Sequence, residues 1–237
     1  MNWRHELKFI IDEATFHHLY FTLRPILHSD RHANGDDPAG FRSYRIRSLY
    51  FDDTGKSGIF DKLAGVDPRH KYRIRIYDDN DQLIHLEKKI KHSDLTMKQS
   101  CRISRAQVDG LLAGDPEAIL DTSSRSRARD DQLLLQFYSE IRVRLLTPNL
   151  LVDYDRIPLV WPDGNVRITF DCHLASSMGR PDLWDPAAAM KPVLEPGELI
   201  MEVKFDHFLP DFIRSAIQSP GISPLSISKY VLCSDNN

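Results

Sequence analysis

The sequence predicts an α+β domain in which eight antiparallel strands close into a β-barrel tunnel with a charged lumen, flanked by a few helices. Three observations support this prediction. Strand-like runs of alternating residues recur along most of the chain, with a few helical segments between them. On several of these runs the cations share one face and the apolar residues share the other. The chain as a whole has a net charge of −3, so its cations are concentrated on particular faces.

Length and composition fit one folded domain over 1–237. Of the 237 residues, 41% are hydrophobic and 27% are charged, which excludes a mainly disordered chain, a collagen-like chain and a coiled coil. No window approaches the ~18–20 apolar residues of a membrane-spanning helix. The charged N-terminus has no apolar core of a secretory signal. We therefore expect a cytoplasmic protein that does not insert into a membrane.

The first part of the chain predicts strands interrupted by one helix. Residues 3–11 form a strand, and Asp12 caps a helix whose apolar residues recur at helical spacing up to Leu27. Residues 28–40 are polar and rich in turn-forming residues, which indicates a loop. Further strands are predicted over 43–52, 70–78 and 83–91.

The second part predicts short helices and the remaining strands. Ser104 caps a short helix that ends near Gly114, and 132–140 is helical in composition. The polar stretch 121–131 is expected to be exposed. A last short helix fits 210–218. Strands are predicted over 141–147, 150–160, 166–174 and 198–206.

Cationic side chains share one face on most of these strands, because successive side chains of a strand point to opposite faces. Such faces carry Arg45 and Arg47; Arg73 and Arg75; His85, Glu87, Lys89 and Lys91; Arg142 and Arg144; Arg167, Thr169 and Asp171; and Glu202 and Lys204. A half-exposed sheet explains any one of them. Several together would stack like charges across the sheet, which is destabilising. A closed barrel with an anion or a metal in its lumen accounts for them better.

The predicted ligand carries many phosphates. Arginine offers paired donors to phosphate oxygens, and lysine offers a point charge. Glu87 and Glu202 lie among these cations and are carboxylates of the kind that hold Mg²⁺ or Mn²⁺ against phosphate. The chain has no Walker A loop and no GxGxxG motif, so neither a P-loop nor a Rossmann nucleotide site is supported. Few aromatic residues interleave the cations, and nucleic acid is not an expected partner.

Eight short motifs follow one another along the chain. They are RHELKF (4–9), IRSLYFD (46–52), KYRIR (71–75), LEKKIK (86–91), YDR (154–156), VRITFD (166–171), MEVK (201–204) and SKY (228–230). In order and spacing they resemble the VTC domain, the catalytic module of eukaryotic vacuolar polyphosphate polymerases. That domain belongs to the CYTH-like triphosphate tunnel metalloenzymes. The resemblance covers nearly the whole chain.

The resemblance implies an eight-stranded tunnel that binds ATP with Mn²⁺ or Mg²⁺ and passes its γ-phosphoryl group to a growing polyphosphate chain. It implies catalytic residues at Arg73, Arg75, Lys89, Arg156, Arg167 and Glu202. It implies substrate-binding cations at Lys8, Arg47, Lys91, Lys98, Lys204 and Lys229. Glu202 is the implied metal ligand, with Glu6 and Glu87 as weaker candidates for the metal or for orienting the lysines.

One departure from the superfamily pattern bears on the reaction. Hydrolases and cyclases of this superfamily typically begin with Glu-x-Glu-x-Lys, whereas this chain has Arg4 at the first position, followed by Glu6 and Lys8. The change removes a carboxylate suited to metal binding and water activation, which favours a polymerase. A metal-dependent triphosphatase and a non-catalytic polyphosphate-binding module stay as alternatives, and the oligomeric state is left open.

Overall fold

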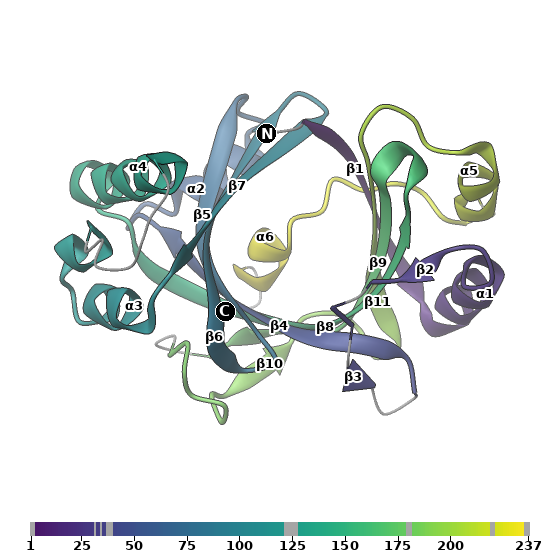
Figure 1. The fold of residues 1–237 in the computed structure, drawn as a ribbon, viewed down its shortest axis with the longest axis horizontal. Helices are drawn as coiled ribbons and strands as arrows, with labels where there is room; N and C mark the ends of the chain where they lie inside the picture. Colours follow the sequence, from purple (N-terminus) through teal and green to yellow (C-terminus); the bar gives the residue numbers. More distant parts are fainter. Residues whose placement is uncertain are drawn as a thin grey trace.

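Eight antiparallel strands close into a ring in the computed structural model, which confirms the predicted barrel (Figure 1). The structure describes residues 3–30, 32–33, 35–36, 40–120, 128–178, 182–218 and 221–234. The barrel strands are β1 (Arg4–Asp12), β4 (Arg42–Asp52), β5 (Arg69–Tyr77), β6 (Asn80–His92), β7 (Leu95–Ile103), β8 (Thr147–Trp161), β9 (Val166–Ser177) and β11 (Glu198–Phe205). Around the ring their order is β9-β11-β1-β7-β6-β5-β4-β8, and pairing of β8 with β9 closes it.

Three short strands pair with the barrel strands. They are β2 (His28–Ser29) on β8, β3 (Gly35–Asp36) on β4 and β10 (Met190–Pro192) on β9. Residues 28–40, predicted as a loop, therefore contain two of these short strands where they are described.

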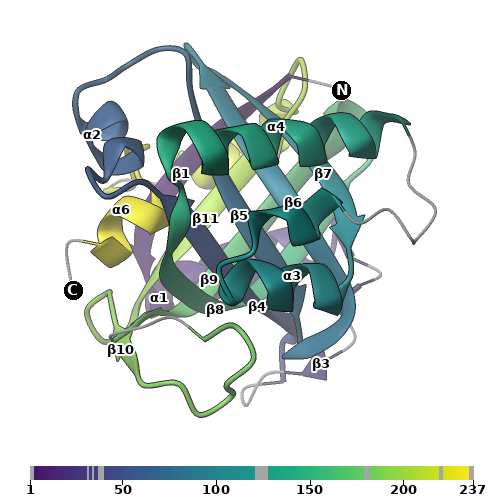
Figure 2. The same cartoon turned by 90° about the vertical axis from the view of Figure 1, so that its left-hand side faces the viewer.

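Helices cover the outside of the barrel on two sides (Figures 1 and 2). They are α1 (Glu13–Leu23), α2 (Ser57–Leu63), α3 (Arg105–Leu112), α4 (Ala128–Arg144) and α5 (Asp211–Ile217). Helix α6 (Lys229–Ser234) instead lies within the ring of strands in the view of Figure 1. Two 3₁₀ turns, η1 (Pro116–Leu120) and η2 (Asp163–Asn165), complete the elements. Helices α1 and α5 lie beside β9 and β11, and α3 and α4 lie beside β5, β6 and β7. Among the described residues, no helix is long and apolar enough to cross a membrane.

The helix starts follow capping chemistry that is visible in the sequence. The Asp12 carboxylate accepts a hydrogen bond from the Thr15 amide at 2.8 Å and begins α1. Ser104 and Gln107 form a reciprocal capping box that begins α3. Helix α1 ends at Leu23, one turn before the predicted Leu27.

The predicted strand at 141–147 is wrong, and the eighth strand is instead β7, which was not predicted. Residues 141–144 belong to α4, where Ile141 packs on the core one turn after Phe137. Val143 is 78% exposed, so the short alternation of arginine and apolar residues did not mark a sheet face. Most of the stretch 121–131, expected to be exposed, lies outside the described residues.

Apolar side chains pack on the outside of the barrel and charged side chains face its lumen. Ile74, Leu86 and Phe137 belong to a core beneath α3 and α4, while Phe170 and Met201 belong to a core beneath α1 and α5. Burial of these outward faces is the main stabilising contribution to the barrel wall. It leaves the inward faces free to carry charge.

Candidate functional site

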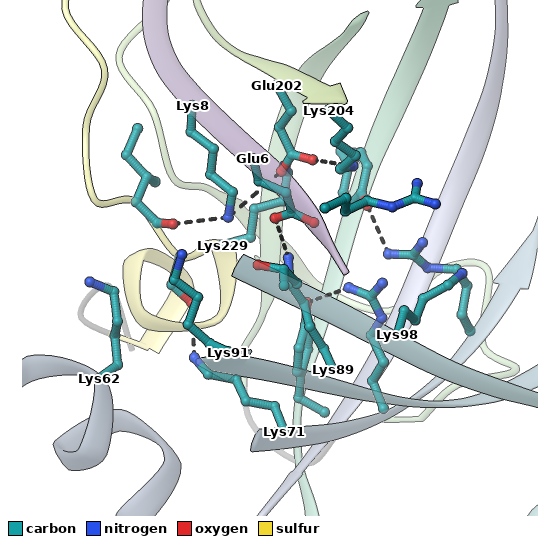
Figure 3. A pocket seen from close by; sticks show the side chains of 18 of the residues that line it. Glu6, Lys8, Lys62, Lys71, Lys89, Lys91, Lys98, Glu202, Lys204 and Lys229 are labelled. Carbon is teal, nitrogen blue, oxygen red and sulfur yellow. Dashed lines mark hydrogen bonds and ion pairs between the residues drawn. The ribbon is translucent and has the colours of Figure 1, made fainter. Parts of the chain in front are cut away.

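A cavity of about 390 Å³ lies in the lumen, and every barrel strand contributes to its wall. Helix α6 and the segment before it, residues 225–228, also line it. The predicted site residues that line the cavity are Glu6, Lys8, Arg73, Arg75, Lys89, Lys91, Lys98, Arg156, Arg167, Glu202, Lys204 and Lys229. Residues from strands far apart in the sequence thus converge on one charged site (Figure 3).

Glu87 lies behind this wall as a buried counter-ion. Its side chain is 1% exposed. Its Oε2 accepts a hydrogen bond from Arg73 Nε at 2.7 Å, and its Oε1 accepts one from Lys98 Nζ at 2.6 Å. Burial would raise the pKa of Glu87, but Arg73, Arg75 and Lys98 outweigh that effect and hold the pKa well below its usual value. Glu87 therefore stays ionised and orients Arg73 and Lys98. It is not among the residues that line the cavity.

Glu202 is the carboxylate with the most cationic neighbours. Lys204 Nζ lies 2.6 Å from its Oε2, and Lys229 Nζ lies 2.7 Å from its Oε1. Arg156 and Lys8 lie farther away, at 3.7 and 4.0 Å. Burial opposes ionisation, but these cations keep the pKa of Glu202 well below its usual value.

Asp171 is a buried carboxylate that holds Arg156 and Lys229 in place. Its two oxygens accept hydrogen bonds from Arg156 Nε at 2.6 Å and Nη2 at 2.7 Å, a bidentate pair. Lys229 Nζ lies 2.6 Å from the same carboxylate. The sequence placed Asp171 on the charged face but assigned it no role. Its position opposite Arg156 in the β8–β9 register is the signal that identifies it.

Glu6 is the second carboxylate in the cavity wall. Its Oε2 accepts a hydrogen bond from Lys89 Nζ at 2.6 Å. Burial would raise the pKa of Glu6, but Lys89, Lys204 and Lys8 lower it to about 2. In the β1–β11 register Glu6 faces Lys204, and Lys8 faces Glu202. The two carboxylates therefore lie on neighbouring strands with their lysines interleaved.

Several lysines of the site are largely buried without enough negative charge around them. Burial and repulsion from Lys89 lower the pKa of Lys8 to about 7. Burial lowers the pKa of Lys204 to about 8, although Glu202 opposes the change. In Lys229 burial is outweighed by Asp171 and Glu202, which raise its pKa. A lysine with a lowered pKa is one that an arriving anion stabilises in its charged form.

Tyrosine hydroxyls complete the wall, although the sequence analysis assigned them no role. Arg73 Nη1 donates to Tyr50 Oη at 2.9 Å, and Arg75 Nη2 donates to Tyr154 Oη at 2.9 Å. Arg167 donates to Tyr44 Oη at 2.8 Å and also pairs with Asp30 at 2.7 Å. These contacts hold the guanidinium groups in defined orientations.

Arg47 does not line the cavity, contrary to the expectation that it contacts substrate. The inward face of β4 carries Tyr44, Ser48 and Tyr50, which line the cavity or contact its arginines. Arg47 lies on the opposite face and is 1% exposed. Its Nε and Nη2 donate to Asp153 at 3.0 and 2.8 Å. Arg45 shares that face and pairs with the same aspartate at 2.9 Å.

The lining carboxylates suit a metal ion whose remaining ligands are phosphate oxygens of the substrate. Among the described residues, no cluster of three or more His, Cys, Asp or Glu side chains can hold a metal by itself. Glu6 and Glu202 are the lining carboxylates where the chain is described. Mg²⁺ commonly binds through one or two carboxylates plus substrate phosphates. The donor set fits a cation that arrives with a phosphate ligand.

Comparison with solved structures finds the same fold in one distant protein and weaker similarity to others. The candidate adenylyl cyclase HpAC1 from Hippeastrum, described as having a dominant triphosphatase activity, matches with a TM-score of 0.53 and 11% identity, over 100% of this chain and 96% of its own. A candidate adenylate cyclase from Bacillus halodurans has a TM-score of 0.48 and 15% identity, covering 92% and 88%. The PH1819 protein from Pyrococcus horikoshii has a TM-score of 0.48 and 11% identity, covering 99% of each chain.

The sequence comparisons identify a family but no individual relative. No curated protein sequence gives a significant match. The family model of the VTC domain, however, matches residues 3–235, which is nearly the whole chain and includes every strand of the barrel. The charged tunnel and the family match agree, and the chain belongs to the VTC domain family.

Proposed function

We propose that this chain is a polyphosphate polymerase, which binds ATP with Mn²⁺ or Mg²⁺ in the tunnel and transfers the γ-phosphoryl group to a polyphosphate chain. The observation that carries the proposal is the charge balance of the tunnel wall. Cations from all sides converge on one cavity, and the lining carboxylates Glu6 and Glu202 are too few to neutralise them. A triphosphate supplies the missing negative charge.

Phosphoryl transfer needs positioning and electrostatic stabilisation more than a side-chain nucleophile. A terminal oxygen of the acceptor chain forms a bond to the γ-phosphorus, the bond to the β–γ bridging oxygen breaks, and ADP leaves. Charge on the transferring group spreads over its oxygens. Arg73, Arg75 and Arg156 are already fixed by Glu87, Tyr154 and Asp171, so they meet this charge without reorganising.

The lysines and the carboxylates of the cavity wall have different roles in this proposal. Lys8, Lys89 and Lys204 lie beside the lining carboxylates and attract phosphate as point charges. Glu202 and Glu6 would hold the metal together with phosphate oxygens, and the metal would neutralise charge on the β- and γ-phosphates. With Glu202 engaged by a metal, Lys204 and Lys229, which now pair with it, would be available to the substrate.

Arg4 supports a polymerase over a hydrolase. It lines the cavity on β1, and its Nε lies 3.9 Å from Asp206. A hydrolase needs a group that activates water, and an arginine does not serve as a base because it stays protonated. A cation at this position instead favours an anionic acceptor such as a phosphate chain.

The direct test is incubation with ATP, Mn²⁺ and a short polyphosphate primer, with the products resolved on a gel. The proposal predicts chains longer than the primer, with ADP formed in step with chain growth. Release of orthophosphate without longer chains would show a triphosphatase. Binding of polyphosphate without consumption of ATP would show a non-catalytic binding module.

A further inference from the structure

Lys71 on β5 lines the cavity without a carboxylate partner. Where the chain is described, no carboxylate oxygen lies within 4.0 Å of its Nζ. Lys89 lies directly opposite in the β5–β6 register, and its Nζ lies 2.6 Å from Glu6 Oε2. Lys71 therefore faces a like charge across the strands, while the nearest acid in that part of the wall pairs with its neighbour.

Three cations from different elements surround Lys71. Arg69 lies on the same strand, Lys89 on β6 and Lys62 on α2, and each of them repels the ammonium form of Lys71. Asp52 on β4 attracts that form at longer range. Burial and the repulsion outweigh this attraction and lower the pKa of Lys71 to about 7. Near neutral pH a large share of the molecules therefore carries a neutral amine at this position.

The contacts of the Lys71 amine leave its nitrogen able to react. Its Nζ donates a hydrogen bond to Ser228 Oγ at 3.0 Å and lies 5.0 Å from the centre of the Tyr230 ring. Tyr230 stays uncharged, since burial raises the pKa of its hydroxyl. Because the serine oxygen accepts a hydrogen from the amine, the lone pair of a neutral nitrogen stays unused. A desolvated lysine beside other cations is an activated nucleophile.

The cations on this side of the cavity suit an electrophile that carries phosphate. Lys62, Arg69 and Lys91 line the cavity, and none of them has a carboxylate within 4.0 Å in the described part of the chain. Figure 3 shows Lys62 and Lys91 on the same side of the cavity as Lys71 and away from Lys204. An acyl phosphate combines a phosphate group for these cations with an activated carbonyl carbon for the amine.

We propose that Lys71 is a site of acylation by acyl phosphates, whose phosphate group is bound by Lys62, Arg69 and Lys91. The Lys71 nitrogen forms a bond to the carbonyl carbon, the bond between that carbon and the phosphate oxygen breaks, and the electron pair leaves with the phosphate. The proton lost by the nitrogen passes to the phosphate, so the products are an N-acylated lysine and hydrogen phosphate. The reaction removes a positive charge from the cavity wall. It needs neither ATP nor polyphosphate and is independent of the proposed function.

The test follows the acetylation of individual lysines by mass spectrometry near neutral pH, with two reagents. Acetyl phosphate carries a phosphate group, whereas the N-hydroxysuccinimide ester of acetic acid is uncharged. The wild type is compared with Arg69→Gln, which removes one phosphate contact, and with Arg24→Gln, which removes an exposed charge that does not line the cavity. The exposed Lys56 and the ion-paired Lys89 serve as references within each protein.

In the wild type, acetyl phosphate should modify Lys71 about tenfold faster than Lys56 or Lys89, or more, because an ordinary lysine with a pKa of about 10.4 holds very little neutral amine near pH 7. The ratio of the Lys71 rates with acetyl phosphate and with the uncharged ester should fall about fivefold in Arg69→Gln, the effect of losing one partly exposed charge pair. It should stay at the wild-type value in Arg24→Gln. Both reagents attack the same neutral amine, so this ratio cancels any change in the pKa of Lys71.

Equal rates for Lys71 and the exposed Lys56 with acetyl phosphate would overturn the proposal, because the cavity would then give the lysine no special reactivity. A rate ratio in Arg69→Gln that equals the wild-type ratio would also overturn it. Lys71 would in that case react without a bound phosphate group, and acyl phosphates would not be its specific reagents.

Discussion

Lys229 and Glu202 are 27 residues apart in the sequence, and the lysine Nζ donates to the glutamate Oε1 at 2.7 Å. The contact joins the first residue of α6 to β11. It places the C-terminal helix against a carboxylate that faces the cavity. Glu202 is thus a counter-ion for lysines in the free protein and, in our proposal, a ligand for metal-bound triphosphate. The two roles give different outcomes when the residue is changed.

Replacement of Glu202 by glutamine keeps the size of the side chain and removes its charge. If Glu202 binds the metal, phosphate transfer should fall by about 100-fold or more, since a metal's charge stabilisation is worth several kcal/mol. Tripolyphosphate binding without metal should persist or tighten, because a repelling carboxylate is gone. The measurement is a Mn²⁺ titration of turnover. A variant curve that overlays the wild-type curve would leave Glu202 as a counter-ion only.

Replacement of Glu87 by glutamine should act on stability and not on metal dependence. Glu87 is buried between Arg73 and Lys98, and breaking a buried ion pair by removing one partner costs about 3–5 kcal/mol. Denaturant unfolding at neutral pH should show this loss, and added tripolyphosphate should recover part of it by neutralising the freed cations. A Mn²⁺ midpoint shifted as far as in Glu202→Gln would contradict the assignment of Glu87 as a counter-ion.

Tripolyphosphate binding should weaken as the pH rises through the pKa values of the buried lysines. The pKa is about 7 for Lys8 and about 8 for Lys204 in the free protein, so both lose charge above these values. In the Lys8→Arg variant the decline should move to higher pH, because arginine stays charged. Calorimetry over this pH range measures the effect. Identical profiles for the two proteins would exclude Lys8 as the titrating group.

The same lysines set the sign of a stability change in the free protein. Unfolded lysines keep their protons up to about pH 10.4, whereas folded Lys8 releases its proton near pH 7. Between these values the unfolded chain binds more protons, so the contribution of Lys8 to the free energy of unfolding rises with pH. Denaturant unfolding of wild type and Lys8→Met at several pH values measures this contribution. A difference between the two proteins that is independent of pH would contradict it.

The hydroxyl of Tyr230 anchors α6. Its Oη donates to Asp52 Oδ2 at 2.6 Å in a buried contact. Tyr230→Phe should reduce the free energy of unfolding by about 1.5–3 kcal/mol, the usual range for a hydrogen bond to a charged group. Because Lys229 precedes Tyr230, tripolyphosphate affinity should fall as well. Hydrogen exchange should report faster opening of α6 than of the barrel strands. Unchanged exchange in α6 would show that other contacts hold the helix.

Much of the tunnel wall follows from period-two alternation. Arg73 and Arg75, or Glu202 and Lys204, share a face in any strand, and burial of the residues between them fixes that face as the lumen. The same rule misplaced Arg47, because β4 has apolar and polar residues on both faces. Leu49 and Phe51, on the same face as Arg47, pack in the core outside the barrel, and Arg47 pairs there with Asp153 on β8.

Eight strands were predicted and eight form the barrel, but β7 was missed and 141–147 was predicted in its place. The outward face of β7 carries Cys101 and Ile103, but Gln99 interrupts the apolar pattern. The segment 141–147 had a cleaner alternation over a few residues, but it is helical as far as Arg144, and only Thr147 belongs to a strand. Contacts between distant segments, such as Lys71 with Ser228 or Asp171 with Lys229, depend on barrel closure and the path of the C-terminal segment. Local sequence patterns carry no information on either.

Calorimetric titration of the wild-type protein with tripolyphosphate, at low and at high salt, tests the central claim most directly. The tunnel predicts tight binding at low salt, with or without Mn²⁺. It also predicts a steep loss of affinity as salt increases, because several charge pairs form at once and salt screens each of them. Absence of binding at low salt, in both the presence and the absence of Mn²⁺, would contradict a phosphate-binding tunnel.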